Sequence, residues 1–153
     1  MKKLLNNPYL SLAARIAVAW FFIFAAIGKI ADPLTFSKEM SNYGILPLFS
    51  INIISLFLPW LELFTAVLLL GGVRLKANSA LISLMLIVFI SAVLIAMAKG
   101  LNINCGCVSH KITYVGWKKV AENSIMLLAS LYIFFFPVRK FTLEYWYSKD
   151  FNN

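Results

Sequence analysis

Four long runs of apolar residues alternate with shorter polar segments along the chain. They extend from Leu10 to about Ile30, from Ile51 to Leu70, from Ala77 to Ala98 and from Val120 to about Phe136. Each run is close to the ~20 residues that a helix needs to cross the hydrocarbon core of a bilayer. None shows the alternation of a barrel strand, so each must pair its backbone groups within a helix. The pattern predicts an all-α, integral membrane four-helix bundle.

The composition agrees with a chain that is embedded in lipid. Of 153 residues, 61% are hydrophobic and 13% are charged, and the mean hydropathy is +0.84. Soluble domains average about 25% charged residues, so this chain cannot cover a water-facing surface, and its hydrophobicity excludes disorder. The 14 Lys and Arg residues exceed the 6 Asp and Glu residues. They stand singly or in pairs between the apolar runs, which excludes a nucleic-acid-binding face.

The distribution of Lys and Arg predicts the orientation of the spans. Four spans place both termini on one side, and eight of the 14 basic residues fall on that side. Short segments obey the positive-inside rule best, and both the Arg74–Lys76 connector and the Lys2–Lys3 start belong to it. We expect cytoplasmic termini and external loops at about 31–50 and 99–119. The first run lacks a cleavage site and is expected to stay as a span. The aromatic tail 138–153 is expected to lie on the membrane surface.

The two cysteines lie almost side by side, in Cys105-Gly106-Cys107, within the second predicted external loop. A disulfide between such near neighbours bends the backbone tightly, and Gly106 permits that bend. Strained, exposed disulfides are the labile, catalytic kind. A static clip would close a loop of one residue and would stabilise little. The spacing therefore favours thiol–disulfide exchange. Because there is no second cysteine pair, electrons would pass on directly to a quinone, a metal or a partner's cysteines.

A metal site is the alternative for the same loop. Cys105, Cys107 and His110 form a cluster of soft and imidazole ligands suited to Cu(I) or Zn. A closed structural zinc site needs four ligands, and the chain has no other Cys or His. His110 also lies three positions from Cys107, where it can raise the thiolate fraction.

One acidic residue lies near the middle of the second apolar run. An ionisable group at this depth, here Glu62, is costly and is a candidate functional residue. Its partner is either Arg15 or Lys29, both in the first run, and the depths alone do not choose between them. Glu62 would then lock the bundle as an ion pair or accept a proton during redox chemistry.

Three stretches of the chain together resemble one known family. The opening resemblance rests on Trp20-Phe21-Phe22, Gly28-Lys29, Asp32-Pro33, Phe36 and Tyr43-Gly44-Ile45-Leu46-Pro47. The second rests on Leu58-Pro59-Trp60-Leu61-Glu62-Leu63 with Gly71, and the third on Asn104-Cys105-Gly106-Cys107 with Val115-Gly116-Trp117. Together the three stretches resemble the MauE/DoxX-like membrane proteins, and the third is similar to their methylamine-utilisation MauE branch.

The resemblance implies a four-helix protein of the bacterial plasma membrane. It implies extracytoplasmic disulfide or sulfur redox chemistry alongside a thioredoxin-like partner. Cys105 and Cys107 would be the redox pair, and Arg15, Lys29 and Glu62 would be the polar core. The leading hypothesis is a membrane-embedded thiol–disulfide oxidoreductase or its accessory factor. A copper- or zinc-handling protein and a non-catalytic scaffold for a soluble redox partner are the alternatives.

Overall fold

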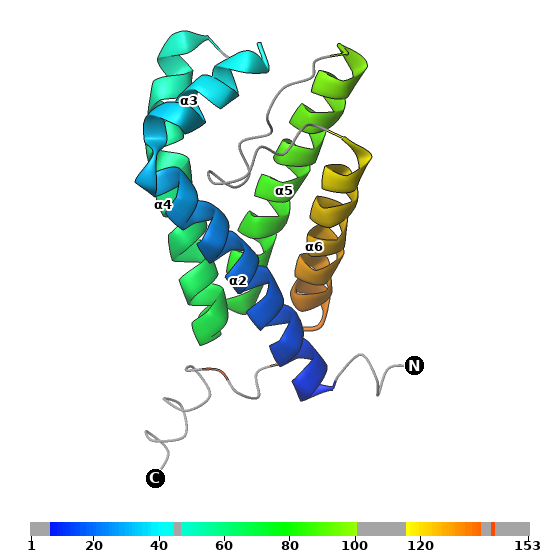
Figure 1. Cartoon of the computed structure of the whole chain (residues 1–153). Coiled ribbons are helices and arrows are strands. Elements are labelled where there is room, and N and C mark those ends of the chain that lie inside the picture. Colours follow the sequence, from blue (N-terminus) through cyan, green and yellow to red (C-terminus); the bar gives the residue numbers. More distant parts are fainter. Residues whose placement is uncertain (1–6, 45–46, 101–115, 139–141, 143–153) are drawn as a thin grey trace.

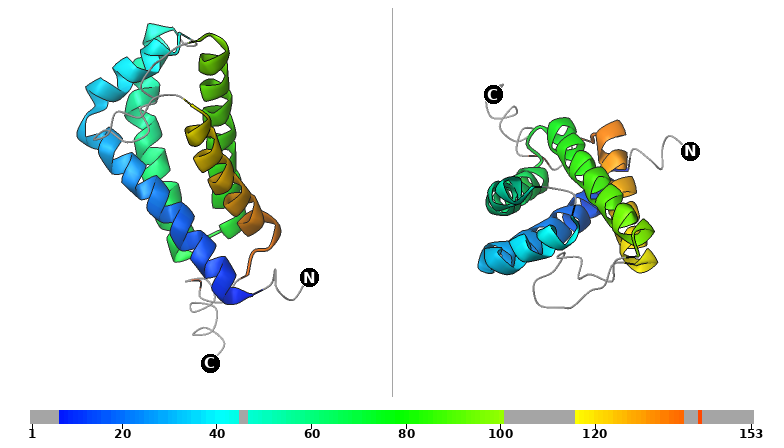
Figure 2. Two further views of the ribbon diagram at one scale, coloured as in Figure 1. Left: turned by 45° about the vertical axis from the view of Figure 1, so that its right-hand side comes forward. Right: turned by 90° about the horizontal axis from the view of Figure 1, so that it is seen from above.

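Five helices follow one another in the computed structural model, which describes residues 7–44, 47–100, 116–138 and 142. They are α2 (Pro8–Ala31), α3 (Pro33–Asn42), α4 (Leu48–Gly71), α5 (Leu75–Ala98) and α6 (Trp117–Phe135). The described ranges contain no strand. The four longer helices run side by side, and α3 lies at one end of them (Figures 1 and 2). Helix α2 packs mainly against α4, and α5 packs mainly against α6.

The bundle has two distinct ends. We call the end that carries α3 the α3 end; the C-terminal ends of α2 and α5 and the N-terminal ends of α4 and α6 also lie there (Figure 1). The opposite end, which we call the connector end, carries the short connection 72–74 between α4 and α5. The start of α2 and the end of α6 lie at this connector end (Figure 1).

Three helices are long and apolar enough to cross a membrane, and they correspond to the first three apolar runs. They are Pro8–Ala31, Phe49–Gly71 and Leu75–Ala98. Their large outward-facing side chains, such as Trp20, Phe57 and Val88, are exposed, which suits contact with lipid. The fourth run does form a helix, α6, but α6 has 19 residues and begins Trp-Lys-Lys-Val-Ala-Glu. That α6 also crosses the membrane stays a prediction.

The segment 31–50, which was predicted to be a loop, contains helix α3 and the first turn of α4. Asp32 precedes a proline, and a residue in that position is disfavoured in the α conformation, so α2 ends there. The Asp32 carboxylate then accepts a hydrogen bond from the Thr35 N–H at 3.0 Å, and Pro33 occupies the first helical position. Both features start a new helix. The apolar pattern missed α3 because the helix is short and mostly polar.

A glycine ends α4 and turns the chain toward α5. Gly72 has a left-handed conformation, with φ of 73°. Its N–H donates to the Leu69 carbonyl at 3.1 Å, and the Val73 N–H donates to the Leu68 carbonyl at 3.0 Å. This pair of bonds is a Schellman motif, which satisfies carbonyls that the end of a helix leaves without partners. The tight turn fixes α4 antiparallel to α5.

Small side chains and hydroxyl groups join the helices in the centre of the bundle. Ala19 of α2 and Ala66 of α4 are fully buried, which lets these helices approach closely, as small residues do in membrane bundles. Between α5 and α6, the Ser83 hydroxyl donates to the Ser130 hydroxyl at 3.0 Å, and Ser130 donates to the Ser79 carbonyl at 2.9 Å. The apolar core consists of Val18, Ala19, Phe22, Ala66, Leu69, Leu75, Ile82, Leu86 and Ile133.

Candidate functional site

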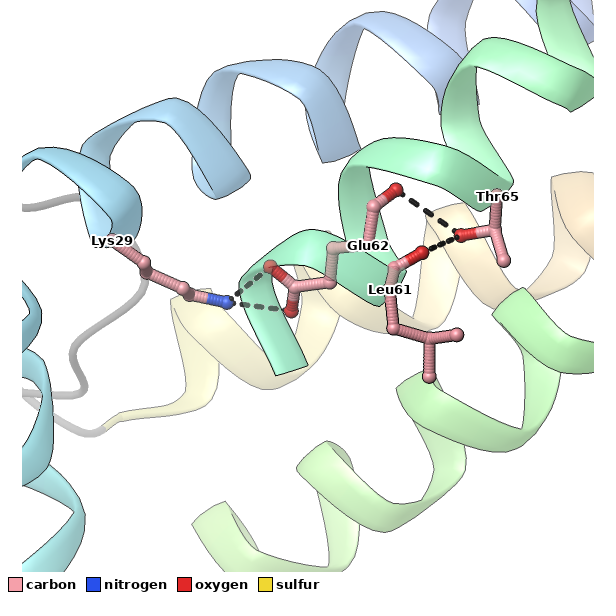
Figure 3. A network of polar contacts seen from close by, with 4 residues as sticks. All are labelled: Lys29, Leu61, Glu62 and Thr65. Atoms are coloured by element: carbon pink, nitrogen blue, oxygen red, sulfur yellow. Dashed lines mark hydrogen bonds and ion pairs between the residues drawn. The ribbon is translucent and has the colours of Figure 1, made fainter. Parts of the chain in front are cut away.

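A buried ion pair joins α2 to α4. The Lys29 ammonium donates to Glu62 Oε1 at 2.6 Å and to Oε2 at 2.8 Å (Figure 3). The two side chains are only 6% and 9% exposed. On the next turn of α4, the Thr65 hydroxyl donates to the Leu61 carbonyl at 2.8 Å and lies 3.1 Å from the Glu62 carbonyl (Figure 3). Of the two partners considered for Glu62, the structure selects Lys29.

Helix α3 covers the lysine of this pair. The Lys29 ammonium lies 5.1 Å from the centre of the Phe36 ring, a distance at which a cation is attracted to the face of an aromatic ring. Lys29 also belongs to the last turn of α2, where the helix dipole favours positive charge. Phe36 is buried, and so is Glu39, one turn further along α3. In the described part of the chain, Lys29 of α2, Glu39 of α3 and Glu62 of α4 are thus all buried charged residues.

The acidic groups around α3 have opposite tendencies to bind a proton. Burial raises the pKa of Glu39; the Asp32 carboxylate raises it further, and Lys29 opposes both effects. Hydrogen bonds from the Thr35 side chain and N–H hold the pKa of Asp32 below its ordinary value. Burial, with a contribution from the Glu39 charge, raises the pKa of Tyr43 to about 12. The pKa of Glu39 is therefore raised, whereas that of Asp32 is lowered.

Arg15 does not join this cluster. Its Nε donates to the Leu69 carbonyl at 3.1 Å, and its Nη2 donates to the Leu70 carbonyl at 2.6 Å. These carbonyls belong to the last turn of α4, at the connector end. A guanidinium at the C-terminus of a helix satisfies carbonyls without intrahelical partners and complements the dipole. Arg15 is only 1% exposed, so the geometry gives it a structural contact between α2 and α4.

A second buried lysine lies at the start of α6. The Lys119 ammonium contacts Glu122 Oε2 at 2.8 Å and lies 5.9 Å from the centre of the Phe21 ring of α2. The sequence analysis singled out neither Lys119 nor Glu39 as a candidate site residue. The spacing offered a signal in both places: Lys119 and Glu122, like Phe36 and Glu39, stand three residues apart and so share one face of a helix.

The cysteine loop lies outside the described residues, and with it Cys105, Gly106, Cys107 and His110. Its flanks are described: α5 ends at Ala98, and α6 begins at Trp117, both at the α3 end (Figure 1). Within the described ranges, no three His, Cys, Asp or Glu side chains are grouped as a metal site would need. The predicted interfacial tail is also outside the described residues, except for Val138 and for Thr142, which is 1% exposed.

Comparison with known proteins assigns the chain to a family. A protein-family profile described as "Methylamine utilisation protein MauE" matches residues 7–136. The chain belongs to the MauE family. The MauE match begins at the N-cap of α2 and ends at the C-cap of α6, so it covers every helix described above. Together with the three apolar helices, membership of the MauE family makes this chain a membrane protein.

Two curated MauE proteins are similar over most of the chain. The "Methylamine utilization protein MauE" of Methylophilus methylotrophus is 30% identical over 142 residues, which are 90% of this chain and 74% of that protein. The protein of the same name from Paracoccus denitrificans is 28% identical over 135 residues, covering 87% of this chain and 73% of the relative. No solved structure matches the chain significantly.

Proposed function

We propose that this MauE-family protein is an accessory factor of the bacterial plasma membrane that exchanges thiols and disulfides through Cys105 and Cys107. One observation carries the proposal: the chain's two cysteines stand in a segment whose described flanks both leave the α3 end of the bundle. Cys105 follows Gly100 by five residues, and an extended chain spans at most about 18 Å over that distance. The thiols therefore act at the end of the bundle that contains the Lys29–Glu62 pair.

The proposed reaction is an exchange with an extracytoplasmic protein, either thioredoxin-like or a maturing substrate. A partner thiolate attacks the Cys105–Cys107 disulfide and forms a mixed disulfide. The partner's second thiolate then releases the chain as a dithiol, and the partner leaves as a disulfide. Two electrons pass from the partner to the chain, and the released thiolates take up protons. The reverse exchange follows the same steps.

The names of the two relatives suggest the setting. Both are methylamine utilization proteins, and we extend that setting to this chain as an accessory role.

Thiol trapping in intact cells tests the proposal. A membrane-impermeant maleimide with a mass tag is added before and after mild reduction, and the gel shift is measured. We expect labelling that appears after reduction in the native chain. A chain with both Cys105→Ser and Cys107→Ser has no cysteine and serves as the blank. Either single substitution should abolish partner oxidation or reduction while leaving the protein folded.

Three other results would contradict this function. Full activity of both single cysteine variants would favour a scaffold, especially if the soluble partner still co-purified. Stoichiometric copper or zinc in the purified protein, lost on His110→Ala, would favour metal handling. Labelling only after cell lysis would place the loop in the cytoplasm.

A further inference from the structure

Several residues at the connector end are buried where the end of a helix bundle would ordinarily be open. Ser11 and Arg15, near the start of α2, are only 1% exposed, and Leu75, the first residue of α5, is 5% exposed. Gly72 is also buried, although it lies in the turn after α4 and turns usually run over the surface. Other parts of the chain therefore cover these residues at the end of the bundle.

One of the covering residues comes from the chain beyond α6. Thr142 follows Phe135, the last residue of α6, by seven residues, and it is only 1% exposed. A Cβ placed on Gly72 would lie 2.8 Å from Thr142 Cβ and 2.6 Å from Thr142 Cγ2. The same point would lie 2.6 Å from Arg15 Nη2. Thr142 and the guanidinium of Arg15 are therefore neighbours over the turn that ends α4.

This contact links two helices that lie diagonally across the bundle. Helix α4 packs mainly against α2, α3 and α5, whereas α6 packs mainly against α2 and α5. The C-terminal ends of both α4 and α6 lie at the connector end (Figure 1). Thr142 therefore brings the chain that leaves α6 to the end of α4, and it joins two helix ends that the packing of the helices themselves leaves apart.

We infer that Thr142 is a seal that keeps water away from the Arg15 guanidinium at the connector end. Arg15 donates to the Leu69 and Leu70 carbonyls in the last turn of α4. A long basic side chain near the end of a membrane helix would otherwise extend its charged group toward water. Because hydrogen bonds are stronger where water is excluded, the seal strengthens the contact by which Arg15 holds α2 to α4.

The seal goes beyond the proposed thiol exchange, and neither depends on the other. The described flanks of the cysteine segment leave the α3 end of the bundle, whereas Thr142 contacts the connector end. The inference concerns a closed state of the connector end, in which a buried threonine covers a buried cation. Displacement of Thr142 should open Arg15 to water.

Chemical modification of arginine tests the seal in the purified full-length protein. Phenylglyoxal reacts with guanidinium groups that water can reach, and mass spectrometry identifies each modified residue. In the native chain, Arg74, which is exposed, should be modified readily, and Arg15 should be protected. Thr142→Lys places a charged group in the buried position and should bring the modification rate of Arg15 close to that of Arg74. Thr35→Lys, the same change at an exposed threonine of α3, should leave Arg15 protected.

A second, smaller change remains informative if Thr142→Lys does not fold. Cysteine is close to threonine in size, so Thr142→Cys in the chain without native cysteines should keep the fold. In detergent, its thiol should react with a maleimide far more slowly than that of Lys76→Cys, because Lys76 is exposed. The added change Gly72→Ala, whose Cβ would overlap residue 142, should speed the reaction of the buried thiol. Gly100→Ala, at the opposite end of the bundle, should not.

Three results would overturn the seal. The first is modification of Arg15 as fast as that of Arg74 in the native chain. The second is continued protection of Arg15 in a folded Thr142→Lys protein. The third is an equal maleimide rate for Thr142→Cys and Lys76→Cys. Circular dichroism of every variant separates local opening of the connector end from general unfolding.

Discussion

Lys29 and Glu62 satisfy each other's hydrogen-bonding groups inside the bundle. Neither side chain has water available to replace the other, since both are almost completely buried. Removal of one partner from a buried pair leaves an uncompensated charge, whereas replacement of both by apolar groups is often nearly neutral.

This difference predicts the effect of substitution at the pair. Lys29→Met should destabilise the protein by about 3–5 kcal/mol, and the double variant Lys29→Met with Glu62→Met should recover most of that loss. The measurement is unfolding in detergent followed by circular dichroism. Lys76→Met is the matched control, because Lys76 is exposed on α5 and a surface change costs less than about 0.5 kcal/mol. Equal losses in all three variants would show that the pair is not coupled.

The identity of the partner of Glu62 could not be predicted from depth alone. If the segment 31–50 were a loop, it would not fix the positions of α2 and α4 relative to each other along the bundle axis. Because the segment folds into α3, the start of α4 lies beyond the end of α2 (Figures 1 and 2). Glu62, well inside α4, is thereby level with Lys29, near the end of α2. The position of Arg15 then matches the last turn of α4 instead.

Among the helices, the apolar runs predicted four elements well and their ends less well. Helices α2 and α3 start, and helix α4 ends, where capping groups act and not where hydrophobicity changes. Helix α2 begins at Pro8 because the Asn7 side chain accepts from the Tyr9 N–H at 3.1 Å. Helix α6 begins three residues before the apolar run, and its added residues include the buried Lys119. Lys119 was therefore assigned to the predicted loop 99–119, and its burial in the bundle was missed.

At the end of α4, Gly72 occupies a position that we expect to tolerate no side chain. A Cβ on Gly72 would lie 2.6 Å from Arg15 Nη2 and 2.6 Å from Thr142 Cγ2. Gly100 is also left-handed, with φ of 67°, but no atom of the described residues lies within 4 Å of such a Cβ. Both Gly→Ala variants bear the backbone cost of about 1–2 kcal/mol. Gly72→Ala should lose clearly more stability than Gly100→Ala in the same unfolding experiment, and equal losses would mean that the close approach is unimportant.

For the whole molecule, the arrangement of the helices makes the predicted orientation in the membrane testable. Lys38 on α3 and Lys76 at the start of α5 are both exposed and lie at opposite ends of the bundle. In a chain without cysteines, Lys38→Cys should react with an impermeant maleimide in intact cells. Lys76→Cys should react only after permeabilisation. The reverse pattern would place the termini outside, contrary to the distribution of Lys and Arg.

The Lys29–Glu62 pair also constrains how the chain enters the membrane during synthesis. Helix α2 carries two buried basic residues and α4 carries one acid, and each charge at the centre of a lone inserting helix costs about 2.5–3.5 kcal/mol on translocon scales. By contrast, α5 has no charge beyond its first turn and can insert by itself. Since only α3 separates α2 from α4, their charges can meet as soon as α4 leaves the ribosome. We expect the hairpin α2–α3–α4, with Lys29 and Glu62 already paired, to be the unit that the insertion machinery releases into lipid.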